Sequence, residues 1–217
     1  MAQFLDPLLI VALALNFVAL GVSRIRGVIN AVAIQGILLG IFPLLLHPEY
    51  MTEIELRVVL LVVGTVTLKG FVIPAFLNQA MREADIQHEV KPVVSYMTSL
   101  LLGAIGTALA VVFARKLELE ARHRDSLIAE ASLATVWMGF LMLTTRRQAI
   151  MQVLGYLLLE NGIFLFGLLL LTAGEYLVEI GILLDLFTGV FVMGIIIHHI
   201  SREFASTSTE HLTELKE

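Results

Sequence analysis

The chain has 217 residues, of which 58% are hydrophobic and only 15% are charged, and its mean hydropathy is +0.91. So few polar residues cannot solvate a globule, and the composition predicts an integral membrane protein whose surface faces lipid. The formal net charge of −5 argues against nucleic acid as a partner, and the lack of cysteine excludes disulfides, thiolate metal sites and iron–sulfur ligation in this chain.

Seven apolar runs are long enough to cross about 30 Å of hydrocarbon at about 1.5 Å per residue. They cover approximately residues 4–22, 27–46, 56–80, 92–114, 127–145, 149–172 and 177–199. The first run has no Lys or Arg before it and no cleavage motif after it, so we expect a retained helix and not a signal peptide. The runs are too uniformly apolar for the strands of a barrel, and the predicted fold class is an all-α polytopic membrane protein of about seven helices.

Basic residues in the short connections predict the orientation, because such residues favour the cytoplasmic side. An outside amino terminus puts a set of them inside: Arg24, Arg26, Arg82, Lys91, Arg146, Arg147, Arg202 and Lys216. The connection 115–125 disagrees, since it would hold basic residues outside, mixed there with acidic ones. We expect a multi-pass protein of the cytoplasmic membrane with its amino terminus outside and its carboxyl terminus in the cytoplasm.

The same charged connection is the expected division of the chain. It separates an N-terminal four-helix region, 1–114, from a C-terminal three-helix region, 127–200. The connection itself spans 115–126, and a polar cytoplasmic tail follows at 201–217. No internal repeat is evident in the sequence.

Three ionisable residues fall near the centre of predicted helices. Helical rise puts Glu160 about 18 Å from the inner end of its run, Asp185 about 13 Å from the outer end of the next, and Lys69 about 20 Å into the third. An ionisable group at this depth costs roughly 2.5–3.5 kcal/mol on insertion scales. Each of them therefore needs an oppositely charged partner, a change of protonation that makes it neutral, or contact with water inside the bundle. Glu179 is shallower, about one helical turn inside the outer boundary.

Two interpretations of this layer stay open. Burial favours the neutral form of acids and of lysine, so the groups could exchange protons through water as a relay. Alternatively, an acid and a base could neutralise each other and simply fix the register of two helices. Pro74, five residues after Lys69, removes a backbone hydrogen bond and could bend the helix beside the lysine or admit water.

Other polar residues are weaker candidates. Tyr156 precedes Glu160 by one helical turn, and Asn161 follows it, but aromatic and amide side chains between helices more often serve packing. His198 and His199 end the last run, where solvation is more usual than proton delivery. The spacing of Gly155 and Gly162 indicates close helix contact. No metal-ligand spacing and no catalytic motif is present, so we expect no metal site and no catalysis by this chain alone.

Over nearly its whole length the chain resembles a known family, hydrogenase-4 component E, and the specific motifs lie in residues 146–190. The resemblance rests on Arg146-Arg147-Gln148, on the run GYLLLENG from Gly155 to Gly162, and on the run VEIGILLD from Val178 to Asp185. The last three helices also look like the K subunit of respiratory complex I and the C subunit of multisubunit sodium/proton antiporters. The lysine-bearing run with Lys69, Gly70 and Pro74 looks like the additional helices that distinguish component E from those shorter relatives.

The resemblance implies a non-catalytic membrane subunit of a nickel–iron hydrogenase or formate hydrogenlyase type complex. It implies proton-relay roles for Glu160 and Asp185, where aspartate is one methylene shorter than the glutamate of the complex I relative. Lys69 and Glu179 would be secondary participants. The expected partners are antiporter-like and quinone-subunit-like membrane proteins and a peripheral arm with nickel–iron and iron–sulfur centres. The alternatives are a subunit of a cation/proton antiporter without redox chemistry, or a structural spacer.

Overall fold

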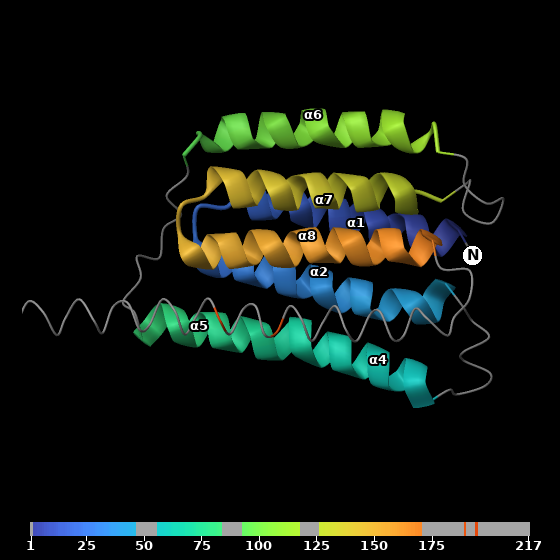
Figure 1. The fold of residues 1–217 in the computed structure, drawn as a ribbon, viewed down its shortest axis with the longest axis horizontal. Coiled ribbons are helices and arrows are strands. Elements are labelled where there is room, and N and C mark those ends of the chain that lie inside the picture. Colours follow the sequence, from blue (N-terminus) through green and yellow to red (C-terminus); the bar gives the residue numbers. More distant parts are fainter. Residues whose placement is uncertain are drawn as a thin grey trace, which may run out of the picture.

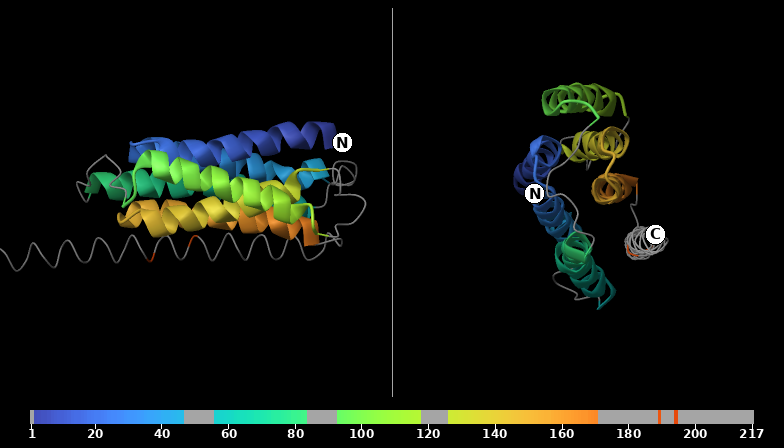
Figure 2. Two further views of the ribbon diagram at one scale, coloured as in Figure 1. Left: turned by 90° about the horizontal axis from the view of Figure 1, so that it is seen from above. Right: turned by 90° about the vertical axis from the view of Figure 1, so that its left-hand side faces the viewer.

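The described helices lie side by side as a bundle of long rods. The computed structural model describes residues 2–46, 56–83, 93–117 and 126–170, with the isolated positions 189 and 194. The elements are α1 (Ala2–Gly21), α2 (Ile25–Leu46), α4 (Leu56–Thr67), η1 (Leu68–Val72), α5 (Ile73–Glu83), α6 (Tyr96–Ala114), α7 (Ile128–Thr145) and α8 (Ala149–Leu170). Their axes are nearly parallel or antiparallel (Figure 1). The right-hand view in Figure 2 looks along these axes and shows the helices as separate from one another.

The expectation of an all-α membrane protein is confirmed. Five described helices are long and apolar enough to cross a membrane, and the apolar stretch Leu5–Gly21 of α1 is shorter. α4, η1 and α5 follow one another without a gap and form one continuous rod. The described helices coincide with the first six predicted runs, but the run 177–199 lies outside the described residues, so the count of seven stays a prediction.

α7 is central to the packing, since it contacts α8, α6 and α1. The contact with α8 is close because glycine faces backbone there: a Cβ atom at Gly162 would lie 2.6 Å from the backbone nitrogen of Val136. At Gly155 a Cβ atom would lie 3.0 Å from the nitrogen of Leu143. Small residues allow such approach between membrane helices. The predicted close contact at Gly155 and Gly162 is therefore confirmed.

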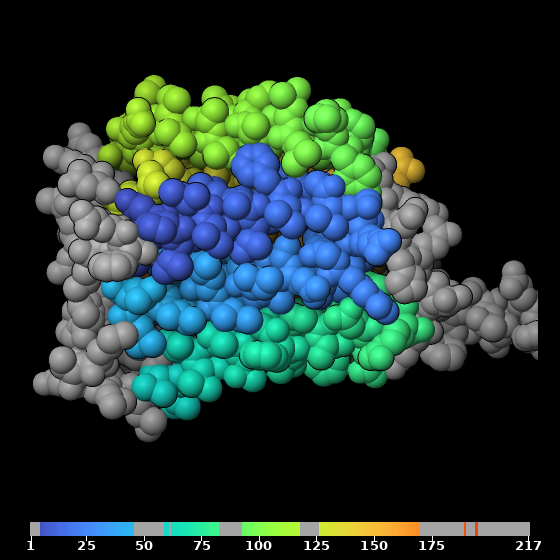
Figure 3. Space-filling model, turned by 180° about the vertical axis from the view of Figure 1, so that it is seen from behind, coloured from blue at the N-terminus to red at the C-terminus, as the bar shows by residue number. Residues whose placement is uncertain are grey.

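α2 joins the two sides of the bundle, because it packs against α1, α4, η1 and α8. The space-filling view from behind shows α6, α1, α2 and the α4–α5 rod lying next to one another in that order (Figure 3). Helices that are separated by more than a hundred residues thus pack together in two apolar clusters, and residues from several of them can meet at the same depth.

The turn between α7 and α8 is held by a buried arginine. Arg146 is 2% exposed, and its Nη2 donates a hydrogen bond to the carbonyl of Leu20 at 2.8 Å. That carbonyl lies in the last turn of α1, where helix carbonyls carry partial negative charge. The guanidinium also lies 5.2 Å from the centre of the Tyr96 ring at the start of α6. Burial lowers the pKa of Arg146 from its ordinary value, against a smaller opposing effect of Tyr96.

Candidate functional site

The lysine-bearing rod contains one wide helical turn. Residues Leu68–Val72 form a π-helix, in which the backbone N–H of Ile73 donates to the carbonyl of Leu68, five residues back. Pro74 follows directly and has no N–H to continue the ordinary ladder. Such turns occur mostly as single insertions within α-helices, frequently at functional sites. The predicted disturbance beside Lys69 is therefore a wide turn within a continuous rod.

Close backbone approach brings Lys69 against α2. A Cβ atom at Gly36 would lie 2.8 Å from the Cβ atom of Lys69, so a larger residue there would displace the lysine. Gly70, the next residue, faces Ile37 of α2 in the same way, with 2.5 Å between a built Cβ atom and Ile37 Cγ1. A glycine on each helix thus lets the two backbones approach closely, and this approach sets the position of the Lys69 Cβ atom.

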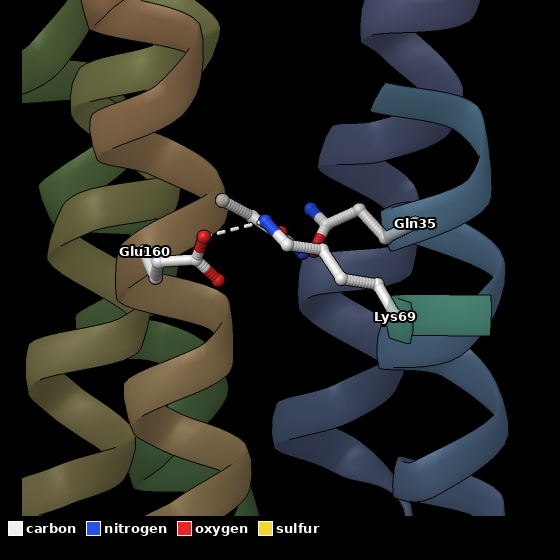
Figure 4. A network of polar contacts seen from close by, with 4 residues as sticks. Gln35, Lys69 and Glu160 are labelled. Atoms are coloured by element: carbon white, nitrogen blue, oxygen red, sulfur yellow. Dashed lines mark hydrogen bonds and ion pairs between the residues drawn. The ribbon is translucent and has the colours of Figure 1, made fainter. Parts of the chain in front are cut away.

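Lys69 forms a buried ion pair with Glu160. The Nζ atom of Lys69 lies 2.6 Å from Oε1 of Glu160, and the side chains are only 5% and 1% exposed. Figure 4 shows the lysine reaching from its own rod to α8, with Gln35 of α2 close by. The two residues are 91 apart in the sequence. The structure thus brings together two of the residues that the sequence put at mid-membrane depth.

Two further groups hold the lysine head. Its Nζ donates to Oδ1 of Asn161 at 3.1 Å, and it lies 5.5 Å from the centre of the Phe164 ring. An aromatic face attracts a cation, and more strongly so where water is excluded. The lysine therefore has contacts besides Glu160 that suit a positive charge.

A pair of this kind can respond to a proton. Removing one partner of a buried ion pair leaves an uncompensated charge, which is strongly unfavourable. A proton added to Glu160 cancels the carboxylate charge without removing the side chain, and the contacts of Lys69 with Asn161 and Phe164 do not depend on that charge. With Glu160 protonated, Lys69 would keep these two neutral contacts.

Beside Asn161, the site contains three polar residues that the sequence analysis did not name: Gln35, Asn16 and Thr135. Asn161 Nδ2 donates to Oε1 of Gln35 at 3.2 Å, and Gln35 Nε2 donates to Oδ1 of Asn16 at 2.7 Å. Asn16 Nδ2 donates to the hydroxyl of Thr135 at 2.8 Å. We call Asn16, Gln35 and Asn161 the amide chain. Gln35 and Asn16 each lie near the middle of an apolar run, and the depth argument applied to the ionisable residues would have found them.

Of the other predicted site residues, the structure describes only Tyr156. Tyr156 lies one turn before Glu160 on α8 and is half-buried. Glu179, Asp185, His198 and His199 lie outside the described residues. Among the residues that the structure describes, no group of three or more His, Asp or Glu could hold a metal ion.

Fold and site together define a helical membrane protein with a buried lysine–glutamate pair. No model of a known protein family matches the chain, and no solved structure matches it. An uncharacterized protein of Mycobacterium tuberculosis is 29% identical over 195 residues, which cover 89% of this chain and 87% of the relative. Hydrogenase-4 component E of Escherichia coli is 27% identical over 148 residues, 68% of each chain, and that of Shigella flexneri is equally similar. The second similarity is distant and supports the resemblance to component E.

Proposed function

We propose that this chain is a non-catalytic membrane subunit of a proton-translocating, hydrogenase-like oxidoreductase complex. In this role Glu160 takes up and releases protons in a lateral relay with Asp185, and Lys69 and Glu179 take part as secondary groups. The observation that carries the proposal is the buried pair of Lys69 and Glu160, 2.6 Å apart. The distant similarity to hydrogenase-4 component E supplies the kind of complex.

The pair supports a relay because it holds an ionisable acid that is only 1% exposed within a bundle of apolar helices. Intramembrane ionisable residues commonly mark proton and ion paths, and they pair with one another. Glu160 lies on α8, and a relay needs a second group to which its proton can pass. Asp185 is proposed for that step from its sequence position alone, and Tyr156, His198 and His199 are kept as secondary candidates on the same ground.

The proposal includes an assembly and an orientation. The partners would be antiporter-like and quinone-subunit-like membrane proteins, with a peripheral arm that carries the nickel–iron and iron–sulfur centres. The amino terminus would be outside and the carboxyl terminus in the cytoplasm. The carboxyl-terminal region 127–200 would form the part similar to the complex I K subunit. The connection 115–126 would join it to the N-terminal four-helix region, 1–114.

The assembly is tested by purifying the full chain in mild detergent from its own membranes, through a tag, and identifying the bound proteins and metals. We expect subunits that contain nickel and iron to co-purify in fixed proportion. Antiporter subunits without nickel or iron would instead support the cation/proton antiporter alternative. Neither set of partners would contradict both.

The relay is tested with Glu160→Gln in the assembled complex, by following hydrogen-driven proton movement in inverted membrane vesicles. We expect a loss of about 100-fold, the scale that a positioned acid or base contributes to proton transfer. Glu160→Asp keeps the carboxyl group and should retain part of the movement. Glu130→Gln is the matched control, because Glu130 is a half-buried acid in the first turn of α7. Unchanged movement in an intact Glu160→Gln complex would favour the structural spacer.

A further inference from the structure

A run of hydrogen bonds leads away from Lys69 through the amide chain in one direction. Lys69 donates to Asn161, Asn161 to Gln35, and Gln35 to Asn16. Asn16 donates to the hydroxyl of Thr135. The run ends where Thr135 Oγ1 donates to the carbonyl of Ala131 at 2.7 Å. Five helical segments, η1, α8, α2, α1 and α7, contribute to it.

Every member of the amide chain is buried. Asn16 and Gln35 are 0% exposed, and Asn161 is 1% exposed. Gln35 Nε2 makes a second hydrogen bond to the carbonyl of Ala12 at 3.2 Å, which fixes which end of its amide points toward α1. A carbonyl of the main chain can only accept, so Gln35 must present its NH₂ group there and its oxygen to Asn161.

The direction of the run matches a charged lysine. Each side-chain amide turns its oxygen toward Lys69 and its NH₂ group away, so that the negative ends of three successive amide dipoles point toward the ammonium group. Hydrogen bonds in such a run polarise one another and strengthen the next. An ammonium group has three donors and no acceptor, whereas a neutral amine could also accept from an NH₂ group. The geometry therefore favours the ammonium form.

The same run is a poor path for protons. An asparagine or glutamine amide supplies a carbonyl acceptor and two donor hydrogens but no ionisable group in the ordinary pH range. A proton that reached Lys69 would find no titratable group between it and Thr135. The amide chain can thus fix a charge without conducting a proton away from it.

We propose that Gln35, Asn16 and Thr135 are positioning residues that act through Asn161 to keep Lys69 an ammonium ion. Within the relay proposed above, on which this step rests, the mobile proton is then that of Glu160, and the lysine remains charged throughout. Residues of α1 and α2 stabilise the positive charge of Lys69, and α8 carries Glu160, the group that changes protonation.

The charge of Lys69 can be measured directly in the full chain, in lipid nanodiscs, by nitrogen NMR with ¹⁵N-labelled lysine side chains. The chain has four lysines, Lys69, Lys91, Lys116 and Lys216, so each signal can be assigned by replacement with arginine. In Glu160→Gln at neutral pH we expect Lys69 to remain an ammonium ion, because Asn161 still accepts from it. A neutral amine in Glu160→Gln would overturn the inference.

The role of the run is tested by adding a second change to Glu160→Gln. With Gln35→Leu, we expect the ammonium signal of Lys69 to be lost at neutral pH. Thr135→Val is close in shape and removes the hydroxyl that accepts from Asn16 and donates to Ala131, so it should lower the ammonium fraction without unfolding the chain. Ser132→Ala is the matched control, since Ser132 donates to Ala129 of its own helix at 2.8 Å and lies outside the run.

An unchanged ammonium fraction in both Gln35→Leu and Thr135→Val would contradict the positioning role. This readout needs no partner protein and no proton transport. A failure of the relay itself would be seen instead as unchanged proton movement in the Glu160→Gln complex, with Lys69 still charged in the isolated chain. The two proposals can therefore fail separately.

Discussion

Two cations, Lys69 and Arg146, are buried among the residues that the structure describes, and their surroundings differ. Lys69 lies in the middle of a membrane-spanning rod and meets a carboxylate at 2.6 Å. Arg146 lies just beyond the end of α7 and meets a backbone carbonyl at 2.8 Å and an aromatic ring. At the end of a helix the last carbonyls offer partial negative charge, but in the middle of one they are bonded within the helix. A buried cation at mid-helix must therefore find its acceptors on side chains, here those of Glu160 and Asn161.

The comparison predicts the largest loss of stability where one member of the charged pair is removed. Lys69→Leu or Glu160→Leu alone should lower the free energy of unfolding by about 3–5 kcal/mol, because each leaves the opposite charge buried. The double variant Lys69→Leu/Glu160→Leu should cost much less than the sum. Unfolding of the purified chain in detergent, followed by circular dichroism, gives the three values. Costs that simply add in the double variant would show that the two charges do not depend on each other.

Arg146→Leu should have a smaller effect, about 2–3 kcal/mol, since it removes a charged hydrogen bond and a ring contact but leaves only a neutral carbonyl behind. Arg147→Leu is the control on the same turn, because Arg147 is exposed, and it should change the free energy of unfolding by less than about 0.5 kcal/mol. The same detergent unfolding measures both. If Arg146→Leu were as costly as Lys69→Leu, the arginine would have a charged partner and the contrast between the two cations would be wrong.

Gly36→Ala tests whether the packing of α2 positions Lys69. The new methyl group would meet the base of the Lys69 side chain, and we expect a cost of about 1–3 kcal/mol from overpacking. Gly64→Ala is the matched control, since no atom lies within 4 Å of a Cβ atom built there. That change should be neutral or stabilise the helix by up to about 1 kcal/mol. Equal effects at both glycines would mean that α2 does not position the lysine.

Much of the fold could be predicted from the sequence because apolar length alone defines membrane helices. The predicted run 27–46 is α2 within two residues, and 149–172 is α8 within two. The run predicted to begin at 92 starts as a helix only at Tyr96, since Ser95 caps it by accepting from the N–H of Thr98 at 3.2 Å. Such caps depend on local backbone geometry that hydropathy does not contain.

The site could be predicted only in part. Depth along each helix identified Lys69 and Glu160, because charge at mid-membrane is rare and costly. Their pairing could not be predicted, since depth does not tell which face of a helix meets which neighbour. Gln35 and Asn16 were missed because an amide carries no charge, although an unpaired amide in hydrocarbon is also unfavourable. The wide turn at Leu68–Val72 leaves no clear signal in the sequence besides Pro74.

Lys69 and Glu160 are 91 positions apart in the chain, and this distance has a consequence for how the protein is made. At about 5–20 residues per second, a ribosome needs roughly 5–18 s to synthesise the stretch between them. The span that holds the lysine, Val62–Arg82, is the least apolar of the five candidate spans. During that interval Lys69 lacks the carboxylate with which it pairs in the folded chain, since α8 has not yet been made.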